Sequence, residues 1–238
     1  MSRNLPPTVV AGTLTIAASD YPAPPMSFVQ EGEYRGYEPD LQRLICQRLG
    51  LHLGRRNLPM AEYYQSVIRG ECDVVWFNQA ITPERSQLVN FTQPYGLFDE
   101  AVLVKKEAPI FSPSDLSGRR LGGLADSTNL QLGKTFGDVT LVPYPGSDNV
   151  LPEMLTALRN GEIDALIDDE LVLVTAAEAD PSLRIAFTVP TRVPFGIGVH
   201  KDNSALLSAL NSCLQEAIAD GSMVQIWQKW IPYKPFPF

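Results

Sequence analysis

The stretch "TPER" at 82–85 combines a helix start with a side chain that a helix start disfavours. The threonine can cap a helix, the proline suits its first position, and the glutamate suits the positive end of the helix dipole. That dipole opposes Arg85, and one reason to place an arginine there is an anion held between the guanidinium and the free amides of the turn. An arginine turned to solvent, or paired with an acid such as Glu62 or Asp99, explains the spacing equally well.

A second helix start, "ADSTN" at 125–129, offers hydroxyl groups in place of a cation. Ser127 and Thr128 open a helix with no carboxylate in its first turn, and hydroxyls with free backbone N–H groups also bind anions. A plain N-cap is the commoner role for a single serine or threonine. Two such starts, one in each half of the chain, favour anion binding more than either does alone.

The acidic run "DDE" at 168–170 ends a predicted buried strand. Because adjacent strand residues face opposite sides, Asp168 and Asp169 are expected to point apart, one capping the next helix and the other holding a cation. Together with Arg85 and Thr128, they predict a site for a zwitterion, with an anion end and a cation end.

Composition argues against several other classes of function. The formal net charge is −8 and no run of Lys or Arg occurs, so nucleic acid is not an expected partner. Cys46, Cys72 and Cys213 are far apart, and His52 and His200 stand in no ligand spacing, so no metal site is expected. The sequence leaves open whether two of these cysteines form a disulfide. Nucleotide-binding and hydrolase fingerprints are absent, so no cofactor is expected.

The chain contains no apolar stretch long enough to span a membrane. Its first residues, "MSRNLPPTVVAG", lack the apolar core of a secretory signal. The sequence therefore allows either a cytosolic protein or the mature part of an exported one.

Two near-copies of one phrase organise the chain, "VIRGECDVVWF" at 67–77 and "ALRNGEIDALID" at 157–168. Each predicts a helix that ends on a glycine and a buried strand that starts from an aspartate. Alternating strands and helices predict an α/β fold with a parallel sheet covered on both faces, with ligand-facing loops at the carboxyl ends of the strands. The repeat favours two similar lobes, with one larger doubly wound sheet as the alternative.

Periodicity places the other elements. Helices are predicted over 37–50, 60–70, 127–136, 149–161, 204–221 and 223–230, and strands over 13–19, 72–77, 100–106, 119–125, 139–144, 164–168 and 195–201. Aromatic residues near strand or loop ends, Tyr21 and Trp76 among them, are more often core residues than ligand contacts.

The sequence resembles the family 3 extracytoplasmic solute-binding proteins, the amino-acid receptors of ABC importers, over about residues 12–232. The resemblance rests on "GYEPDLQRLICQRLG", "RGECDVVWFNQAITPERSQLVNFTQPY", "DLSGRRLGGLADSTN", "LRNGEIDALIDD" and "GIGVHKDNSALLSALNSCLQEAIADGSMVQIWQKW". It implies an α/β two-lobe clamshell of the periplasmic-binding-protein type II, with hinge strands at "EAVLVKK" and "PFGIGVHK". Lobe 1 would comprise residues 1–104 and 199–238 and lobe 2 residues 105–198, with the ligand between the lobes.

The resemblance also implies roles for individual residues. Arg85 would bind the ligand carboxylate, Thr128 would assist from the other lobe, Asp169 would take the α-ammonium, and Tyr21 would flank the ligand side chain. The other expected ligand-binding residues are Ser127, Trp76, Asn78, Ala80, Met60 and Asp126.

The sequence departs from the family pattern in several places, one of which is "WFNQ" at 76–79, bulkier than the usual small residues. Met60 stands where a stacking aromatic is usual, Ala80 where a hydroxyl often donates, and Asp126 where glycine is usual. The extra acid at Asp126 and Asp168 favours a cationic or amine-bearing solute.

The resemblance thus implies a receptor without catalytic activity for an amino acid or a small amino-acid-like solute. Its expected partner is an ABC transporter membrane permease, its expected state a monomer, and its expected location periplasmic or extracytoplasmic, with the signal or anchor absent from this chain. Two alternatives stay open. One is the ligand-sensing ectodomain of a membrane receptor, and the other is a dehydratase-type enzyme with Glu170 or Asp168 as general acid.

Overall fold

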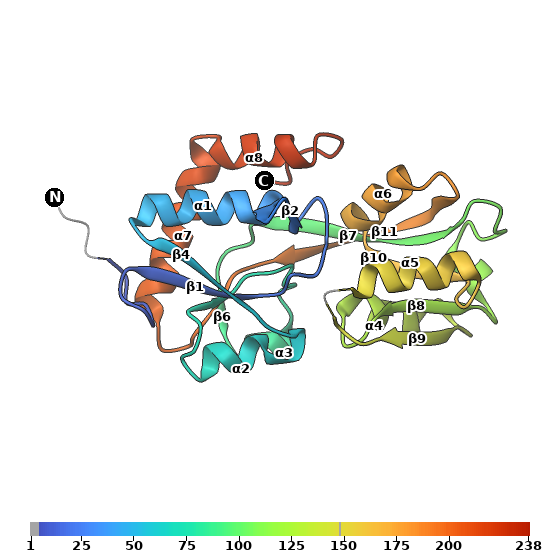
Figure 1. Ribbon diagram of the computed structural model, residues 1–238, viewed down its shortest axis with the longest axis horizontal. Helices are drawn as coiled ribbons and strands as arrows, with labels where there is room; N and C mark the ends of the chain where they lie inside the picture. The colour runs from blue at the N-terminus through green and yellow to red at the C-terminus, as the bar shows by residue number, and fades with distance from the viewer. Residues whose placement is uncertain (1–4, 148) are drawn as a thin grey trace. The chain divides into compact units, whose positions relative to one another are not determined.

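The computed structural model describes residues 5–147 and 149–238, and the chain divides into two compact units (Figure 1). Unit 1 comprises Met1–Asp20, Met26–Leu97 and Val193–Phe238, and unit 2 comprises Tyr21–Pro25 and Phe98–Arg192. The boundaries at residues 97 and 192 fall a few residues earlier in the chain than the lobe boundaries expected from the resemblance, at 104 and 198. The short segment Tyr21–Pro25 groups with unit 2.

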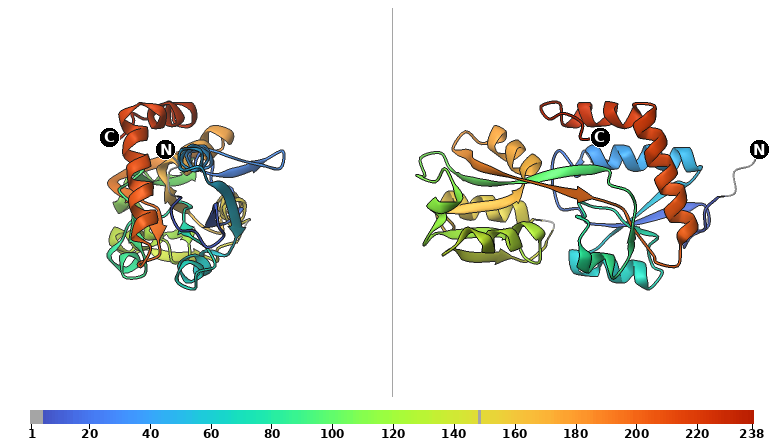
Figure 2. Two further views of the ribbon diagram at one scale, coloured as in Figure 1. Left: turned by 90° about the vertical axis from the view of Figure 1, so that its left-hand side faces the viewer. Right: turned by 180° about the vertical axis from the view of Figure 1, so that it is seen from behind.

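Unit 1 is built on a sheet with the strand order β4-β1-β5-β12-β6, and β2 and β3 form a separate hairpin. Its strands are β1 (Thr13–Ala18), β2 (Phe28–Gln30), β3 (Glu33–Arg35), β4 (His52–Asn57), β5 (Val74–Val75), β6 (Asn90–Phe91) and β12 (Gly198–Val199). Its helices are α1 (Tyr37–Leu49), the 3-10 turn η1 (Met60–Glu62), α2 (Tyr63–Ile68), α3 (Pro83–Ser86), α7 (Ser204–Ala219) and α8 (Ser222–Trp230). Figure 1 shows α1 and α8 on one side of the sheet and α2 and α3 on the other, and the view from behind in Figure 2 shows the same arrangement.

Unit 2 is built on a sheet with the strand order β11-β7-β10-β8-β9. Its strands are β7 (Gly96–Lys105), β8 (Arg120–Leu124), β9 (Thr140–Tyr144), β10 (Ala165–Asp169) and β11 (Leu183–Phe195). Its helices are η2 (Pro113–Leu116), α4 (Thr128–Gly133), η3 (Lys134–Phe136), α5 (Val150–Asn160) and α6 (Glu170–Ala179). Helix α4 packs on β8, β9 and β10, and α5 and α6 pack on β10.

Both sheets are mixed, which corrects the expected parallel arrangement. Strand β1 pairs in parallel with β4 and β5, and β8 pairs in parallel with β9 and β10. Strand β12 runs antiparallel to β5 and β6, and β10 runs antiparallel to β7. The antiparallel strands come from distant parts of the sequence, so helix and strand periodicity within each half does not report them.

The repeated phrase forms the same corner in each unit. Helix α2 is followed by Gly70 with φ 68°, and α5 ends at Gly161 with φ 74°. After each glycine the chain returns to the helix, since the backbone N–H of Glu71 donates to Ser66 (2.8 Å) and that of Glu162 donates to Ala157 (2.9 Å). Both conformations are left-handed, which a glycine adopts at little cost. The duplicated sequence is therefore a duplicated helix-to-strand corner.

Strand β4 was missed because its sequence, "HLGRRN", has no apolar alternation. It pairs with β1 over its whole length, from Thr13 opposite His52 to Ala18 opposite Asn57. An edge strand needs only one partner and carries polar side chains readily, so the pairing with β1 decides its structure.

Strands β7 and β11 contain the unit boundaries at residues 97 and 192. The second of these strands, β11, therefore lies earlier than the expected hinge segment at 194–201, in which Gly198–Val199 forms β12 of unit 1. Pro190 and Pro194 interrupt the sequence of β11, and prolines are tolerated because β11 is at the edge of its sheet.

The cores consist of apolar residues from the predicted strands and helices. In unit 1, Leu14, Ile16 and Val75 of the sheet are fully buried, as is Trp227 of α8. In unit 2 the core is formed by residues such as Val102, Leu121 and Ile167. Cys46, Cys72 and Cys213 are all buried and all in the thiol form, so no disulfide links any two of them. Within residues 5–147 and 149–238, no helix has the length and apolar character needed to cross a membrane.

Candidate functional site

Arg85 lies in the single turn of α3, and its side chain returns to the preceding loop. Thr82 caps the helix by accepting the backbone N–H of Arg85 at 3.2 Å. The Nη1 atom of Arg85 donates to the carbonyl oxygen of Ala80 at 3.1 Å. Of the two acids considered as partners, Glu62 forms a salt bridge with Arg69 at 3.1 Å. Within the described residues, no carboxylate lies within salt-bridge distance of Arg85.

A tyrosine and a glutamine support this arginine. The guanidinium carbon of Arg85 lies 5.8 Å from the centre of the Tyr64 ring, in a cation–π contact. The Tyr64 hydroxyl donates to Oε1 of Gln79 at 2.6 Å, and Gln79 Nε2 donates to the carbonyl of Phe77 at 2.6 Å. Burial raises the pKa of Tyr64 to about 12, so this hydroxyl stays a donor at neutral pH. We call Tyr64, Gln79, Ala80, Thr82 and Arg85 the arginine cluster.

Asn78 occupies a strained position just before this cluster. Its φ is 48°, a left-handed conformation that is uncommon for residues with a side chain. Its backbone N–H donates to Oε1 of Glu38 at 2.8 Å, and its Oδ1 atom is buried with no hydrogen-bond partner.

Trp76 and Met60 have different surroundings. Trp76 is fully buried, 6.0 Å from the ring of Tyr95, so the structure places it in the core of unit 1. Met60 opens the turn η1 and is half-buried.

In unit 2, a tyrosine, an asparagine and two aspartates form a buried polar group that we call the aspartate cluster. Asn129 Nδ2 donates to Oδ1 of Asp168 at 3.0 Å and to Oδ1 of Asp169 at 3.3 Å. The Tyr21 hydroxyl donates to Oδ2 of Asp168 at 3.3 Å. All four residues are less than a tenth exposed.

The expectation that Asp168 and Asp169 point to opposite sides was wrong, since one amide reaches both. Strand β10 ends at Asp169, where the chain turns into α6, so strand alternation no longer applies there. The expected side-chain cap of α6 is also absent at Asp169. Instead, Asp168 Oδ1 accepts the backbone N–H of Asp169 at 2.8 Å.

Acid is concentrated around this cluster. Burial raises the pKa of Asp168 to about 6, although the hydrogen bonds from Asp169, Tyr21 and Asn129 act in the other direction. Glu100 of β7 is paired opposite Asp169, is also buried, and accepts a hydrogen bond from Thr191. Burial raises the pKa of Glu100 as well. A positively charged group would lower the cost of ionising these buried carboxyl groups.

Ser127 and Thr128 at the start of α4 have different roles, one as the helix cap and the other as a hydrogen-bond donor to Asn129. Ser127 is the N-cap, since its Oγ accepts the N–H of Leu130 at 3.1 Å and donates to the carbonyl of Leu124 at 2.7 Å. Thr128 is half-buried and its hydroxyl donates to Oδ1 of Asn129 at 3.1 Å, which links it to the aspartate cluster. Asp126 is exposed and has φ 60°, a left-handed conformation that glycine adopts at little cost.

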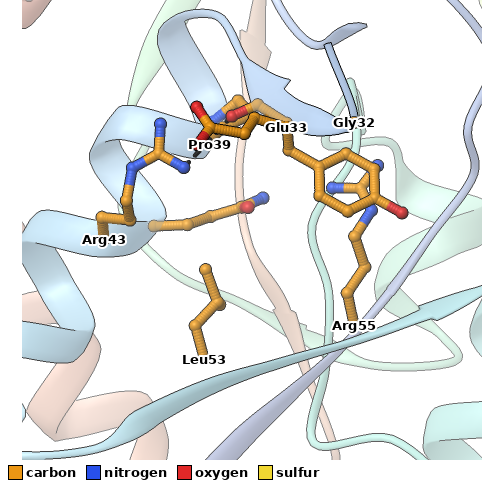
Figure 3. Close-up of a pocket in the computed structure, with 8 residues that line it drawn as sticks. Gly32, Glu33, Pro39, Arg43, Leu53 and Arg55 are labelled. Carbon is orange, nitrogen blue, oxygen red and sulfur yellow. Dashed lines mark hydrogen bonds between the residues drawn. The ribbon is translucent and has the colours of Figure 1, made fainter. Parts of the chain in front are cut away.

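A separate pocket of about 520 Å³ lies in unit 1 between the β2–β3 hairpin, α1 and β4 (Figure 3). Arg43 and Arg55 stand on opposite sides of it, and Leu53 lies between them (Figure 3). Arg43 already donates to Asp40 and to the carbonyl of Tyr34, and the guanidinium of Arg55 lies 4.0 Å from the Tyr34 ring. None of the residues predicted for the site lines this pocket.

Sequence reasoning missed Asn129, Gln79, Glu38 and Glu100. Asn129 directly follows the "ST" helix start, so its position was visible but its role was not. Glu100 and Glu38 reach their partners through pairings distant in sequence, and no local pattern reports those. Within the described residues, no group of three side chains suited to a metal ion is assembled.

The chain is similar to bacterial binding proteins over nearly its whole length. The family described as "Bacterial extracellular solute-binding proteins, family 3" matches residues 15–233. The "ABC transporter arginine-binding protein 1" of Escherichia coli (strain K12) is 29% identical, over 90% of this chain and 88% of that protein. The "Probable histidine-binding protein" of Neisseria gonorrhoeae is 26% identical, over 87% of this chain and 79% of that protein.

A solved structure shows the same fold. "An ancestral arginine-binding protein bound to arginine" superposes with a TM-score of 0.85 at 30% identity, covering 92% of this chain and 98% of that one. The expected fold, that of the type II periplasmic amino-acid-binding proteins, is therefore confirmed.

Proposed function

Because the chain belongs to the family 3 bacterial extracellular solute-binding proteins, we propose that it binds an amino acid or a small amino-acid-like solute for an ABC importer. The similar proteins of Escherichia coli and Neisseria gonorrhoeae support this class, since they are named as an arginine-binding and a probable histidine-binding protein. The family consists of binding proteins, which favours a receptor over the dehydratase alternative.

The observation that carries the proposal is the state of Arg85. Its Nη1 donates to a backbone carbonyl and its guanidinium lies near the Tyr64 ring, so both of these partners of the positive charge on Arg85 are uncharged. A guanidinium presents its donors in a planar fork that matches a carboxylate. Arg85 is therefore the proposed partner of the solute carboxylate.

The aspartate cluster supplies the opposite charge. Asp169 is the proposed partner of the solute α-ammonium, Thr128 an additional hydroxyl contact, and Tyr21 a residue flanking the solute side chain. Asp168 supports this assignment, because the donors that it accepts from in the aspartate cluster are neutral and its burial penalises the charge. A cationic group offsets such a penalty. The excess of acid around the cluster favours a solute with more than one amine or with a cationic side chain.

The test begins with thermal shift measurements against the twenty amino acids, polyamines and small carboxylates. A ligand at 100 times its Kd stabilises the folded protein by about 2.7 kcal/mol, which such a measurement detects. Calorimetry with the best ligand then compares the wild type with Arg85→Ala. Loss of the arginine should weaken binding by about 2–5 kcal/mol.

Arg56→Ala is the matched control, because Arg56 is an exposed arginine of the same unit whose nearest acid is Glu71 at 3.4 Å. It should bind like the wild type, since exposed ion pairs contribute little. Wild-type affinity in Arg85→Ala would remove this assignment of the carboxylate partner.

The partner and the location belong to the same proposal. We infer an extracytoplasmic protein that delivers its solute, as a monomer, to a membrane permease. Light scattering at increasing concentration tests the monomer, and solute-dependent stimulation of a reconstituted transporter tests the delivery.

A further inference from the structure

We propose that Glu38 is a positioning residue for the solute site: its carboxylate holds the segment 76–80, which gives Arg85 its backbone acceptor. The inference rests on the proposed function of Arg85, and it adds a residue that does not itself contact the solute.

Glu38 is a fully buried carboxyl group in the first turn of α1. Its Oε1 atom accepts the backbone N–H of Asn78 at 2.8 Å and the hydroxyl of Tyr95. The carboxylate of Glu38 therefore joins α1 to the loop that follows β5. Tyr95, its second hydrogen-bond partner, is itself held in place by Tyr37, whose hydroxyl donates to the Tyr95 carbonyl at 2.6 Å.

The bond to Asn78 has consequences along the chain. Asn78 has φ 48°, a left-handed conformation that asparagine tolerates better than most residues with a side chain, and the bond from its N–H to Glu38 helps to hold it. The next residue, Gln79, accepts the Tyr64 hydroxyl at 2.6 Å, and the carbonyl of Ala80 accepts Arg85 at 3.1 Å. Three hydrogen bonds, joined by the backbone from Asn78 to Ala80, thus connect Glu38 with the guanidinium of Arg85 and its support, all of them within unit 1.

The polar atoms around this path are incompletely paired. Glu38 Oε2, Trp76 Nε1 and Asn78 Oδ1 are buried without hydrogen-bond partners, as are two nitrogen atoms of Arg55. Unpaired buried groups are costly, and native structures keep them chiefly where they serve function or hold water. Backbone bonds also hold the segment, since the N–H of Gly196 donates to the carbonyl of Gln79 at 3.0 Å and Ala80 forms a bridge with Phe195. Among the bonds that hold the segment, the one from Asn78 to Glu38 is the bond that a charge can strengthen.

The charge of Glu38 is sensitive to pH. Burial raises its pKa to about 7, while the hydrogen bonds from Tyr95 and Asn78 and the charge of Arg55 act in the other direction. The titratable and charged groups facing it are Tyr37 of α1, Tyr95 before β7 and Arg55 of β4. Protonation replaces a charged acceptor with a neutral one and weakens the hold on Asn78.

The first experiment compares Glu38→Gln with the wild type in calorimetric titrations with the best ligand from the screen. Loss of the charged acceptor should weaken binding about ten-fold at pH 8, which corresponds to one hydrogen bond to a charged group. Glu71→Gln is the control, because it removes one partly exposed carboxylate of the same unit. It should bind like the wild type. Wild-type affinity in Glu38→Gln at pH 8 would overturn the inference.

The second experiment measures affinity from pH 5 to pH 8. Wild-type affinity should fall as the pH is lowered through about 7, and Glu38→Gln should lack this step. A further step near pH 6 belongs to Asp168 and should persist in Glu38→Gln. A purely structural role would lower the melting temperature of Glu38→Gln and leave the step near pH 7 in place, which would also overturn the inference.

Arg85→Ala separates this inference from the proposed function. Normal affinity in Arg85→Ala refutes the proposed role of Arg85, and the positioning role of Glu38 with it. Weak binding in Arg85→Ala together with wild-type behaviour of Glu38→Gln refutes the positioning role alone.

Discussion

Asp73 and Asp164 make the same hydrogen bond in two different units. Oδ2 of Asp73 accepts the backbone N–H of Thr15 at 2.7 Å, and Oδ2 of Asp164 accepts that of Arg120 at 2.9 Å. Each aspartate precedes a strand, and each acceptor bond ties the corner to the neighbouring parallel strand. The backbone bonds repeat too, since the N–H of each aspartate donates to the carbonyl of the same partner.

Asp164→Asn should lower the free energy of unfolding by about 1–2 kcal/mol at pH 7, because a charged acceptor for Arg120 is lost. Hydrogen bonds from Arg120 hold the pKa of Asp164 below its ordinary value of 3.8. The stabilisation is therefore present above pH 3.8 and is lost as the pH falls through the lower, folded value. Urea unfolding at pH 7 and pH 3 measures the difference between mutant and wild type, which should shrink at pH 3.

Asp73→Asn is the matched comparison, because burial raises the pKa of Asp73 above 3.8. The stability that this shift contributes is fully present below pH 3.8 and is lost as the pH rises through the pKa of Asp73 in the folded protein. The deficit of Asp73→Asn should therefore not shrink at pH 3. If the stability deficits of Asp164→Asn and Asp73→Asn changed in the same way with pH, the opposite pKa shifts of the two aspartates would be contradicted.

Asp168→Asn should make the protein without ligand relatively more stable as the pH rises from 5 to 7. Burial raises the pKa of Asp168 from 3.8 to about 6. The stability linked to this shift is complete below pH 3.8 and is lost as the pH rises through about 6. The difference between mutant and wild type should grow by about 1 kcal/mol over that interval. Urea unfolding at both pH values measures it, and a constant difference would refute the expectation.

Ser127→Ala and Thr128→Val should separate stability from binding at the start of α4. Ser127 caps the helix, so its loss should cost about 1 kcal/mol of unfolding free energy. Thr128 does not cap α4, so Thr128→Val should change stability less and weaken solute binding by about ten-fold through one lost hydrogen bond. Denaturation and calorimetry on both variants check this contrast. Equal losses of stability with unchanged affinity would remove Thr128 from the site.

Gly122→Ala should destabilise unit 2 by about 1–3 kcal/mol through overpacking. A methyl group at this position of β8 would lie 2.6 Å from Cδ1 of Ile163 and 3.2 Å from Cε2 of Tyr144. Ile163→Val removes that Cδ1 atom, so the double mutant should lose less stability than the sum of the single mutants. Denaturant unfolding of the four proteins gives the coupling, and additive losses would show that Ile163 is not the obstacle.

Several elements could be predicted because their determinants are local. In α1, Leu41, Ile45 and Leu49 are buried at helical spacing and Gly50 closes the helix with φ 69°. The start of α3 likewise follows from "TPER", including the cap at Thr82. The position of Arg85 at that start was visible in the sequence, and so was the duplicated corner.

Most of the helices, the buried strands and the repeated corner thus follow from the sequence alone, and the residue types of a zwitterion site are a prediction made from it. Only the fold shows that β4 pairs with β1, that Asp168 and Asp169 share the amide of Asn129, and that Asn78 donates to Glu38. The reason is physical. Local patterns record the preferences of neighbouring residues, whereas these contacts join segments about 40 residues apart, and packing alone brings such segments together.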